Sequence, residues 1–337
     1  MILLLQIYKQ VLIHVYIVMV RVFYLKNSAW EIDFLVNDLF APVGYDVVFF
    51  NETTPMLVDS DDIGNCILVV NDSYSFEKIE KMVKRMKPLA LFHLSDETGS
   101  KADWLVLSKY VKYYVKQYNH RNYRRDLYPN IVQLPCAYAP TSFTGHAMYV
   151  DSSGAAPHIH PSFRNSLDPI NDGFIKSVRN RSMDWAFIGT IKADRYEMTE
   201  RFRAAFPNGK SITGNNNWDA TKQVVKPCDM LDMYRDAVFC PVGRGNVTLD
   251  CSRIYEAILC GAIPVVVAED VEIDSTFWFD GHVPIFVRAS SWDAAIARCK
   301  YLMANPDDLQ TIQTKNLEWW KRLINGYRTM LRTIKMV

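Results

Sequence analysis

Short apolar runs alternate with amphipathic segments along most of the chain. In the first half, residues 66–70 and 89–94 are mostly apolar, which is typical of strands. Residues 76–87 between them have the spacing of an amphipathic helix, with Ser75 placed to cap it and Pro88 placed to end it. Alternation of this kind predicts an α/β fold.

The second half repeats this pattern and ends in helices. Strands are predicted at 184–188, 237–240 and 262–268, and a helix is predicted at 194–206. Residues 136–173 lose the periodicity and are rich in Pro, Ser, Gly and Asn, which indicates a linker or a long loop. The predicted organisation is an apolar segment at 1–20, an N-terminal domain at 21–150, a linker at 151–180, a C-terminal domain at 181–310 and a final helix at 311–337.

Residues 237–268 read as one strand–helix–strand unit. The first strand runs into a loop that carries Pro241 and Gly243, and a helix opens near Ser252. Gly261 suits the left-handed position that ends a helix, and the second strand follows it at once. A loop and then a strand at 283–287 are expected beyond this unit.

Two charged residues in the first turns of this helix suggest a ligand. Arg253 and Glu256 are three apart, so they share one face close to the free backbone N–H groups of the helix N-terminus. A pyrophosphate at this position would pair with Arg253, and Glu256 would accept hydrogen bonds from ribose hydroxyls. The alternative is an ordinary crossover with an Arg–Glu surface pair.

Three linked motifs resemble the exostosin-like glycosyltransferases of family 47. The motifs are Phe239-Cys240-Pro241-Val242-Gly243, Ser252-Arg253-Ile254-Tyr255-Glu256-Ala257 and Gly261-Ala262-Ile263-Pro264-Val265-Val266. The resemblance implies a GT-B fold, in which two Rossmann-like domains hold the donor site in their cleft and the C-terminal helix crosses back to the first domain. It also implies a UDP-sugar donor bound without a metal or other cofactor, and an oligosaccharide or glycoprotein glycan as acceptor. The C-terminal motifs resemble those of the xylosyltransferase branch, including short exostosin-like proteins of large algal viruses, which implies xylose.

The resemblance extends to the first strand–helix turn of the C-terminal domain, where Gly189 would allow close approach and Arg195 would meet the pyrophosphate. Pro264 stands where retaining enzymes often carry a second Glu, which favours inversion. The full set of predicted donor-binding residues is Gly189, Thr190, Arg195, Pro241, Gly243, Arg244, Ser252, Arg253 and Glu256.

Two carboxylates are candidates for the catalytic base. Ligands of open α/β sheets bind beyond the carboxyl ends of the strands, and the strand at 89–94 opens into Ser95-Asp96-Glu97. An inverting transfer needs a group that takes the proton of the acceptor hydroxyl. Asp96 and Glu97 are therefore the predicted catalytic residues, and the alternative is an acidic pair that caps a helix or solvates a loop.

Other functions remain open from the sequence. Asp59 and Asp61 have the DxD form with which GT-A enzymes hold a divalent metal, and His158 and His160 are spaced to ligate one. Two further alternatives to a glycosyltransferase are a catalytically inactive sugar- or nucleotide-binding protein on the same scaffold and a nucleotide-sugar epimerase.

Composition bears mainly on partners. A net charge of +1 gives no reason to expect nucleic acid, although residues 101–125 interleave Tyr with Lys and Arg. Part of that stretch can line an acceptor groove. Seven cysteines without CxxC spacing predict reduced, mostly buried thiols.

The location depends on the first twenty residues and on glycosylation sequons. Polar residues interrupt the apolar N-terminal segment, so a loose segment before a first strand is expected there, and a membrane anchor through residues 1–20 is the alternative. The sequons begin at Asn51, Asn71, Asn180 and Asn246. A glycan on Asn246 would obstruct the predicted donor site, which favours a cytoplasmic enzyme, in the host cytoplasm if the protein is viral, over a Golgi-type anchored one.

Overall fold

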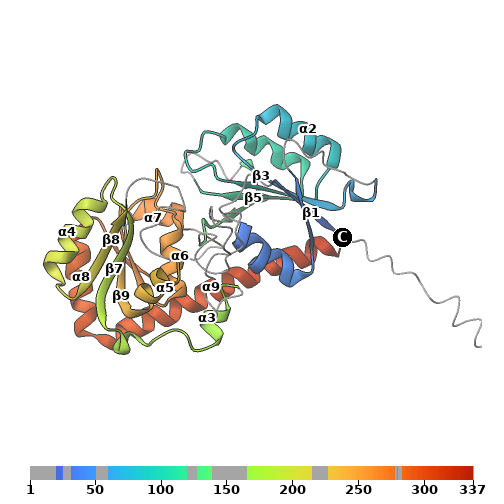
Figure 1. Ribbon diagram of the computed structural model, residues 1–337. Coiled ribbons are helices and arrows are strands. Elements are labelled where there is room, and N and C mark those ends of the chain that lie inside the picture. The colour runs from blue at the N-terminus through green and yellow to red at the C-terminus, as the bar shows by residue number, and fades with distance from the viewer. Residues whose placement is uncertain are drawn as a thin grey trace, which may run out of the picture.

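The chain folds into two parallel sheets that lie side by side, each with helices on both faces (Figure 1). The computed structural model describes residues 20–25, 32–50, 60–119, 127–138, 165–214, 227–277, 279 and 283–336. The two sheets confirm the predicted α/β class with two Rossmann-like domains.

The first sheet has the strand order β2-β1-β3-β4-β5-β6, with every neighbouring pair parallel. Helix α2 (Phe76–Met86) and the helical segment η4 (Ala102–Tyr110) cover one face, and η1 (Phe34–Phe40) packs on the other. The strands are β1 (Arg21–Leu25), β2 (Asp46–Phe50), β3 (Cys66–Asn71), β4 (Ala90–Leu94), β5 (Tyr113–Gln117) and β6 (Ile131–Leu134), and the short helical turns are η2 (Ala41–Val43) and η3 (Ser60–Asp62).

Helix α2 forms as its sequence predicts. The Ser75 hydroxyl accepts a hydrogen bond from the Lys78 N–H at 3.4 Å, which caps the helix. Ile79, Val83 and Met86 are buried at helical spacing against the sheet. All six residues of β3 are buried, as expected for a strand covered on both faces.

The second sheet has the order β11-β10-β9-β7-β8 and is also parallel throughout. The winding direction reverses between β7 and β9, and such a topological switch point is where open α/β sheets bind ligands. The strands are β7 (Met183–Thr190), β8 (Gly209–Gly214), β9 (Ala237–Val242), β10 (Ile263–Val267) and β11 (Val287–Ala289). The helices are α3 (Asp168–Asn171), η6 (Val178–Asn180), α4 (Arg195–Ala205), α5 (Pro227–Asp236), α6 (Ser252–Leu259), α7 (Asp270–Thr276) and α8 (Trp292–Ala304).

Three local expectations are wrong in this domain. Helix α7 occupies part of the expected loop; it was missed because Ile273 and Thr276 are its only buried residues, too few to show a period. The strand expected at 283–287 begins only at Val287. Pro241 lies inside β9 and not in the loop after it. The pairing of β9 with β7 ends at Phe239, so the missing N–H of Pro241 breaks no hydrogen bond to β7.

Helix α9 (Pro306–Lys335) crosses from the second domain back beneath the first, as predicted (Figure 1). It packs against α6 and α8 at one end and against η1 and η2 at the other. One continuous apolar core includes Phe92 of the first sheet, Leu259 of α6 and Trp320 of α9. The Tyr45 hydroxyl also donates to the Leu331 carbonyl at 2.7 Å. The final helix therefore holds the two domains together.

Cys66, Cys136, Cys240, Cys251, Cys260 and Cys299 are free thiols, and all of these except Cys136 are buried. Within the part of the chain that the structure describes, no helix has the length and apolar character to span a bilayer. The predicted domain boundaries remain predictions.

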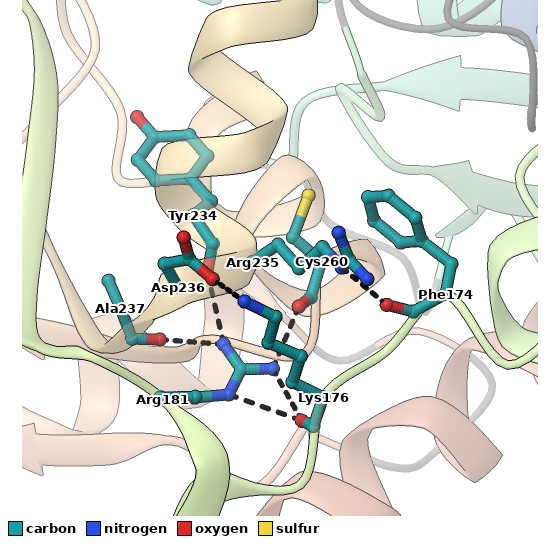
Figure 2. Close-up of polar contacts among 8 residues, drawn as sticks. All are labelled: Phe174, Lys176, Arg181, Tyr234, Arg235, Asp236, Ala237 and Cys260. Atoms are coloured by element: carbon teal, nitrogen blue, oxygen red, sulfur yellow. Dashed lines mark hydrogen bonds and ion pairs between the residues drawn. The ribbon is translucent and has the colours of Figure 1, made fainter.

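Arg181 ties the second domain together at the edge of the sheet where β7, β9 and β10 begin. Its guanidinium donates to the carbonyl groups of Tyr234 at 3.0 Å, Ala237 at 2.6 Å and Cys260 at 2.9 Å, and also to Lys176 (Figure 2). These carbonyls lie at the ends of α5 and α6 and at the start of β9. One side chain thus fixes the ends of the elements that carry the central strand–helix–strand unit.

Gly261 meets the same junction, and its substitution is expected to destabilise the fold. Its φ is +73°, and an added Cβ would lie 2.5 Å from Arg181 Nη2 and 2.5 Å from Ile175 Cγ2. We expect Gly261→Ala to lower the free energy of unfolding by roughly 3 kcal/mol, because strain and overpacking add. Gly326→Ala in α9, where nothing lies within 4 Å, is the control and should raise stability by roughly 0.5–1 kcal/mol. Urea denaturation checks both; equal effects would contradict this account of Gly261.

Candidate functional site

The predicted donor-binding residues gather at the topological switch point of the second sheet. Gly189 and Thr190 end β7, and Gly243 follows the end of β9. Helices α4 and α6 begin next to these strand ends with Arg195 and Ser252. Residues separated by more than sixty positions in the sequence therefore share one edge of the sheet.

Arg253 lies across the end of β7. Its Nε donates to the Ile188 carbonyl at 2.9 Å, and its guanidinium stacks on the Phe187 ring with 4.9 Å between the guanidinium carbon and the ring centroid. A Cβ on Gly189 would collide with Arg253 Nη2, so this glycine makes room for the arginine. Within the described residues the two terminal nitrogens of Arg253 have no hydrogen-bond partner. They can therefore bind an anion without giving up a protein contact.

Arg195 is buried and braces two loops. Nη1 donates to the Thr190 carbonyl at 3.0 Å, and Nη2 donates to the Arg244 carbonyl. The side chain crosses Gly243, where an added Cβ would lie 2.5 Å from Arg195 Cγ. Only Nε of the guanidinium is buried without a hydrogen bond. Direct contact between Arg195 and a pyrophosphate stays a prediction, since both terminal nitrogens are already bonded.

Lys192 adds a third positive charge that sequence reasoning missed. Burial and the charge of Arg253 lower the pKa of Arg195 to about 10. Burial and the charges of Arg195 and Arg253 likewise lower the pKa of Lys192, against an opposing effect of Glu97. The N-cap residue of α6, Cys251, makes no side-chain cap hydrogen bond, so the first N–H groups of the helix add to this positive potential. The site is thus built to attract an anion.

The remaining predicted donor residues differ in their surroundings. Arg244 turns away to form a forked ion pair with Glu272 of α7, with 2.7 Å between Nη2 and Oε2. Ser252 is partly exposed at the first position of α6. Glu256 lies one turn deeper and is 4% exposed. A ribose contact for Glu256 stays a prediction, while Arg244 acts in this conformation as a brace for α7.

Asp96 has no access to an acceptor in this conformation. Its side chain is fully buried, and Oδ2 accepts a hydrogen bond from Lys116 Nζ at 3.0 Å. The backbone N–H of Lys101 donates to Oδ1 at 3.2 Å. A general base must reach the proton that it removes. The geometry supports the alternative reading of Asp96 as a structural carboxylate, and its catalytic role stays a prediction.

Glu97 reaches from the first domain to the second. Its Oε1 accepts hydrogen bonds from the N–H groups of Asn246 at 2.6 Å and Val247 at 2.8 Å, in the loop between β9 and α6. Glu97 therefore contacts the second domain, which carries the predicted donor-binding residues. Its catalytic role stays a prediction, because the carboxylate is occupied in this conformation.

Asp250 forms a second interdomain contact that the sequence did not indicate. It is 1% exposed, and its Oδ2 accepts a hydrogen bond from the N–H of Cys136 in the first domain at 3.2 Å. The Tyr255 hydroxyl donates to Oδ1 at 2.5 Å. Burial raises the pKa of Asp250 to about 7. Cys136 lies 114 residues away from Asp250, so no local sequence pattern indicates this contact. Lys192, in contrast, could have been found from the sequence, because it follows closely after Gly189 and Thr190 in the predicted strand–helix turn.

This raised pKa predicts a pH effect. Between pH 4 and 7 the folded protein keeps a proton on Asp250 that the unfolded chain has lost, so stability falls as pH rises across this window. We expect wild type to lose roughly 4 kcal/mol between pH 4 and 8 relative to Asp250→Asn. Burial also raises the pKa of Asp38 to about 6. Asp38 titrates in both proteins, so its contribution cancels from the difference in stability between them. Melting curves at several pH values check this, and parallel pH profiles would contradict it.

Several sequence candidates lie outside the described residues or away from the site. Residues 1–19, Asp59, His158 and His160 are not described. Asp61 lies in η3, just before β3, and so at the amino edge of the first sheet. That edge is opposite to the one that carries Glu97, so Asp61 is far from the switch-point residues along the strand direction.

No protein-family model matches the chain, and no curated protein matches it. Among solved structures, an α1,3-fucosyltransferase is similar over 94% of this chain and 90% of its own, with 13% identity and a TM-score of 0.48. An α-glucosyltransferase in complex with UDP and a DNA 13-mer containing an HMU base is similar over 94% and 99%, with 13% identity and a TM-score of 0.47. A UDP-N-acetylglucosamine 2-epimerase is similar over 90% and 94%, with 10% identity and a TM-score of 0.39. At this low sequence identity, each similarity is one of fold alone.

Proposed function

We propose that this protein is a glycosyltransferase that uses a nucleoside-diphosphate sugar and binds the diphosphate at the switch point of its second sheet. The observation that carries the proposal is the convergence of Lys192, Arg195 and Arg253 beside the N-terminus of α6. Gly189 and Gly243 let this cluster approach the backbone closely. A diphosphate is the ligand whose charge and oxygen geometry match such a set.

The same residues suit the chemistry of glycosyl transfer. An acceptor hydroxyl attacks the anomeric carbon of the sugar while the bond to the diphosphate oxygen breaks, and the hydroxyl proton passes to a base. Negative charge grows on the leaving diphosphate, where fixed cations and N–H dipoles stabilise it. The motif resemblance supports a more detailed proposal: inversion, no metal, a UDP donor, xylose as sugar and a glycan acceptor. The sequon at Asn246 supports a cytoplasmic location.

A second candidate function is a nucleotide-sugar-binding protein without activity. It is favoured by the state of the two predicted carboxylates, because Asp96 is buried against Lys116 and Glu97 is held by backbone N–H groups. A protein of this kind would bind the donor and release no product.

A single screen separates these functions. Purified protein is incubated with UDP-xylose, UDP-glucose, UDP-glucuronate, UDP-galactose and GDP-fucose, each with EDTA or Mn²⁺. Melting temperature and release of nucleoside diphosphate are both measured. A shift in melting temperature together with release of nucleoside diphosphate supports the enzyme. A shift in melting temperature supports the binding protein if no acceptor brings about release of nucleoside diphosphate. Absence of both with every nucleotide sugar would overturn the proposal, and a strict Mn²⁺ requirement would overturn metal independence.

A further inference from the structure

The loop between β9 and α6 gathers backbone N–H groups around one oxygen. The N–H groups of Asn246, Val247 and Thr248 point to Glu97 Oε1 at 2.6, 2.8 and 3.4 Å. Asn246 Nδ2 donates to Oε2 at 2.9 Å. Successive N–H groups that converge in this way form a nest, an arrangement that binds anions. The carboxylate of Glu97 fills it in this conformation.

The shape and charge of the loop suit an anion in general. The Gly245 N–H donates to the Thr248 carbonyl at 2.8 Å and closes the turn. An added Cβ on Gly245 would lie 2.7 Å from Glu97 Oε1, so the glycine gives the anion its room. Lys192 donates to the side-chain oxygen of Asn246, which places a cation of the candidate site at the border of the nest. The nest and the switch-point cations are therefore neighbours.

The anion in the nest comes from the other domain. Glu97 follows β4 of the first sheet, whereas the nest belongs to the second domain. Two other interdomain bonds are of a different kind: the side-chain amides of Asn119 and Gln133 donate to the Ser275 and Thr276 carbonyls at the end of α7, at 2.5 and 2.6 Å. Those amides cap a helix, while Glu97 uses an anion site beside the proposed donor site.

We propose that the loop 245–248 is a phosphoryl-binding site, and that Glu97 latches the two domains together by filling it until a diphosphate displaces the carboxylate. This inference rests on the proposed function. A diphosphate has more charge and more acceptor oxygens than a carboxylate, so it can engage the nest together with Lys192 and Arg253. Breaking the latch uses part of the binding free energy, which lowers the apparent affinity of wild type.

The test is a calorimetric titration with inorganic pyrophosphate. Glu97→Ala removes the competing carboxylate, so it should bind pyrophosphate about 10-fold tighter than wild type or better, and Glu97→Gln should lie between them. Asp103→Asn is the matched control, because it removes an exposed carboxylate of the same domain outside the nest. It should leave the affinity unchanged.

Hydrogen exchange locates the effect. The amides of residues 246–248 should exchange faster in Glu97→Ala than in wild type, and pyrophosphate should restore their protection. Equal affinity of wild type and Glu97→Ala, an equal gain in Asp103→Asn, or pyrophosphate protection that leaves residues 246–248 unprotected would overturn the latch.

Titration with UDP separates this proposal from the proposed function. If UDP binds wild type and is lost in Arg253→Ala while Glu97→Ala gains no pyrophosphate affinity, the latch is wrong and the donor site stands. If Glu97→Ala gains affinity and loop protection but no nucleotide or nucleotide sugar binds, the phosphoryl site stands and the proposed function fails.

Discussion

Replacing Arg253 with alanine is expected to weaken binding of the nucleoside diphosphate by about 100-fold or more. The Arg253 guanidinium is already oriented by the Ile188 carbonyl and the Phe187 ring, so it loses little freedom when an anion binds. Charge-assisted hydrogen bonds contribute roughly 1.5–3 kcal/mol each, and a forked contact forms two. Isothermal titration with the nucleotide that shifts the melting temperature most measures the loss.

Two further variants make this prediction specific. Arg253→Lys keeps the charge but not the fork, so it should recover only part of the affinity. Arg201→Lys on α4 is the control, because Arg201 is exposed and paired with Asp293 at 2.9 Å. It should bind like wild type. Unchanged affinity in a folded Arg253→Ala protein would remove this residue from the donor site.

Replacing Arg181 with methionine is expected to lower the free energy of unfolding by roughly 4 kcal/mol. The guanidinium donates to carbonyls of Lys176, Tyr234, Ala237 and Cys260, and methionine fills similar volume without any donor (Figure 2). Each buried carbonyl that loses its partner costs about 1–3 kcal/mol, and repacking recovers part of the sum. Urea denaturation followed by tryptophan fluorescence measures the change.

Arg179 provides the matched control two positions away. It pairs with Asp307, whose side chain is 92% exposed, and exposed ion pairs contribute about 0–1 kcal/mol. Arg179→Met should therefore change stability by no more than about 1 kcal/mol. A similar small effect for Arg181→Met would show that the junction does not depend on its guanidinium.

Elements with a strong local signal were predictable from the sequence. The continuous apolar runs of β3 and β4 identified strands, and the stripe of α2 with its Ser75 cap identified an amphipathic helix. Gly261 correctly marked the end of α6, because its φ of +73° is one that glycine adopts without strain. In each case the pattern that carries the signal lies within one element.

The rest depends on contacts between distant segments. The sequence named Glu97 but could not show that its carboxylate enters a nest about 150 residues away. The strand order that places the switch point between β7 and β9 is likewise a property of the whole sheet. Asp250 was missed because Cys136, whose N–H donates to its carboxylate, lies 114 residues away in the sequence.

The most direct test of the central claim is a crystal structure of the protein with the nucleoside diphosphate that binds it. Our account predicts the diphosphate at the switch point of the second sheet, with its oxygens within hydrogen-bond distance of Arg253 and of the first N–H groups of α6. A nucleotide bound instead at the carboxyl ends of β1 and β3, the switch point of the first sheet, would contradict it.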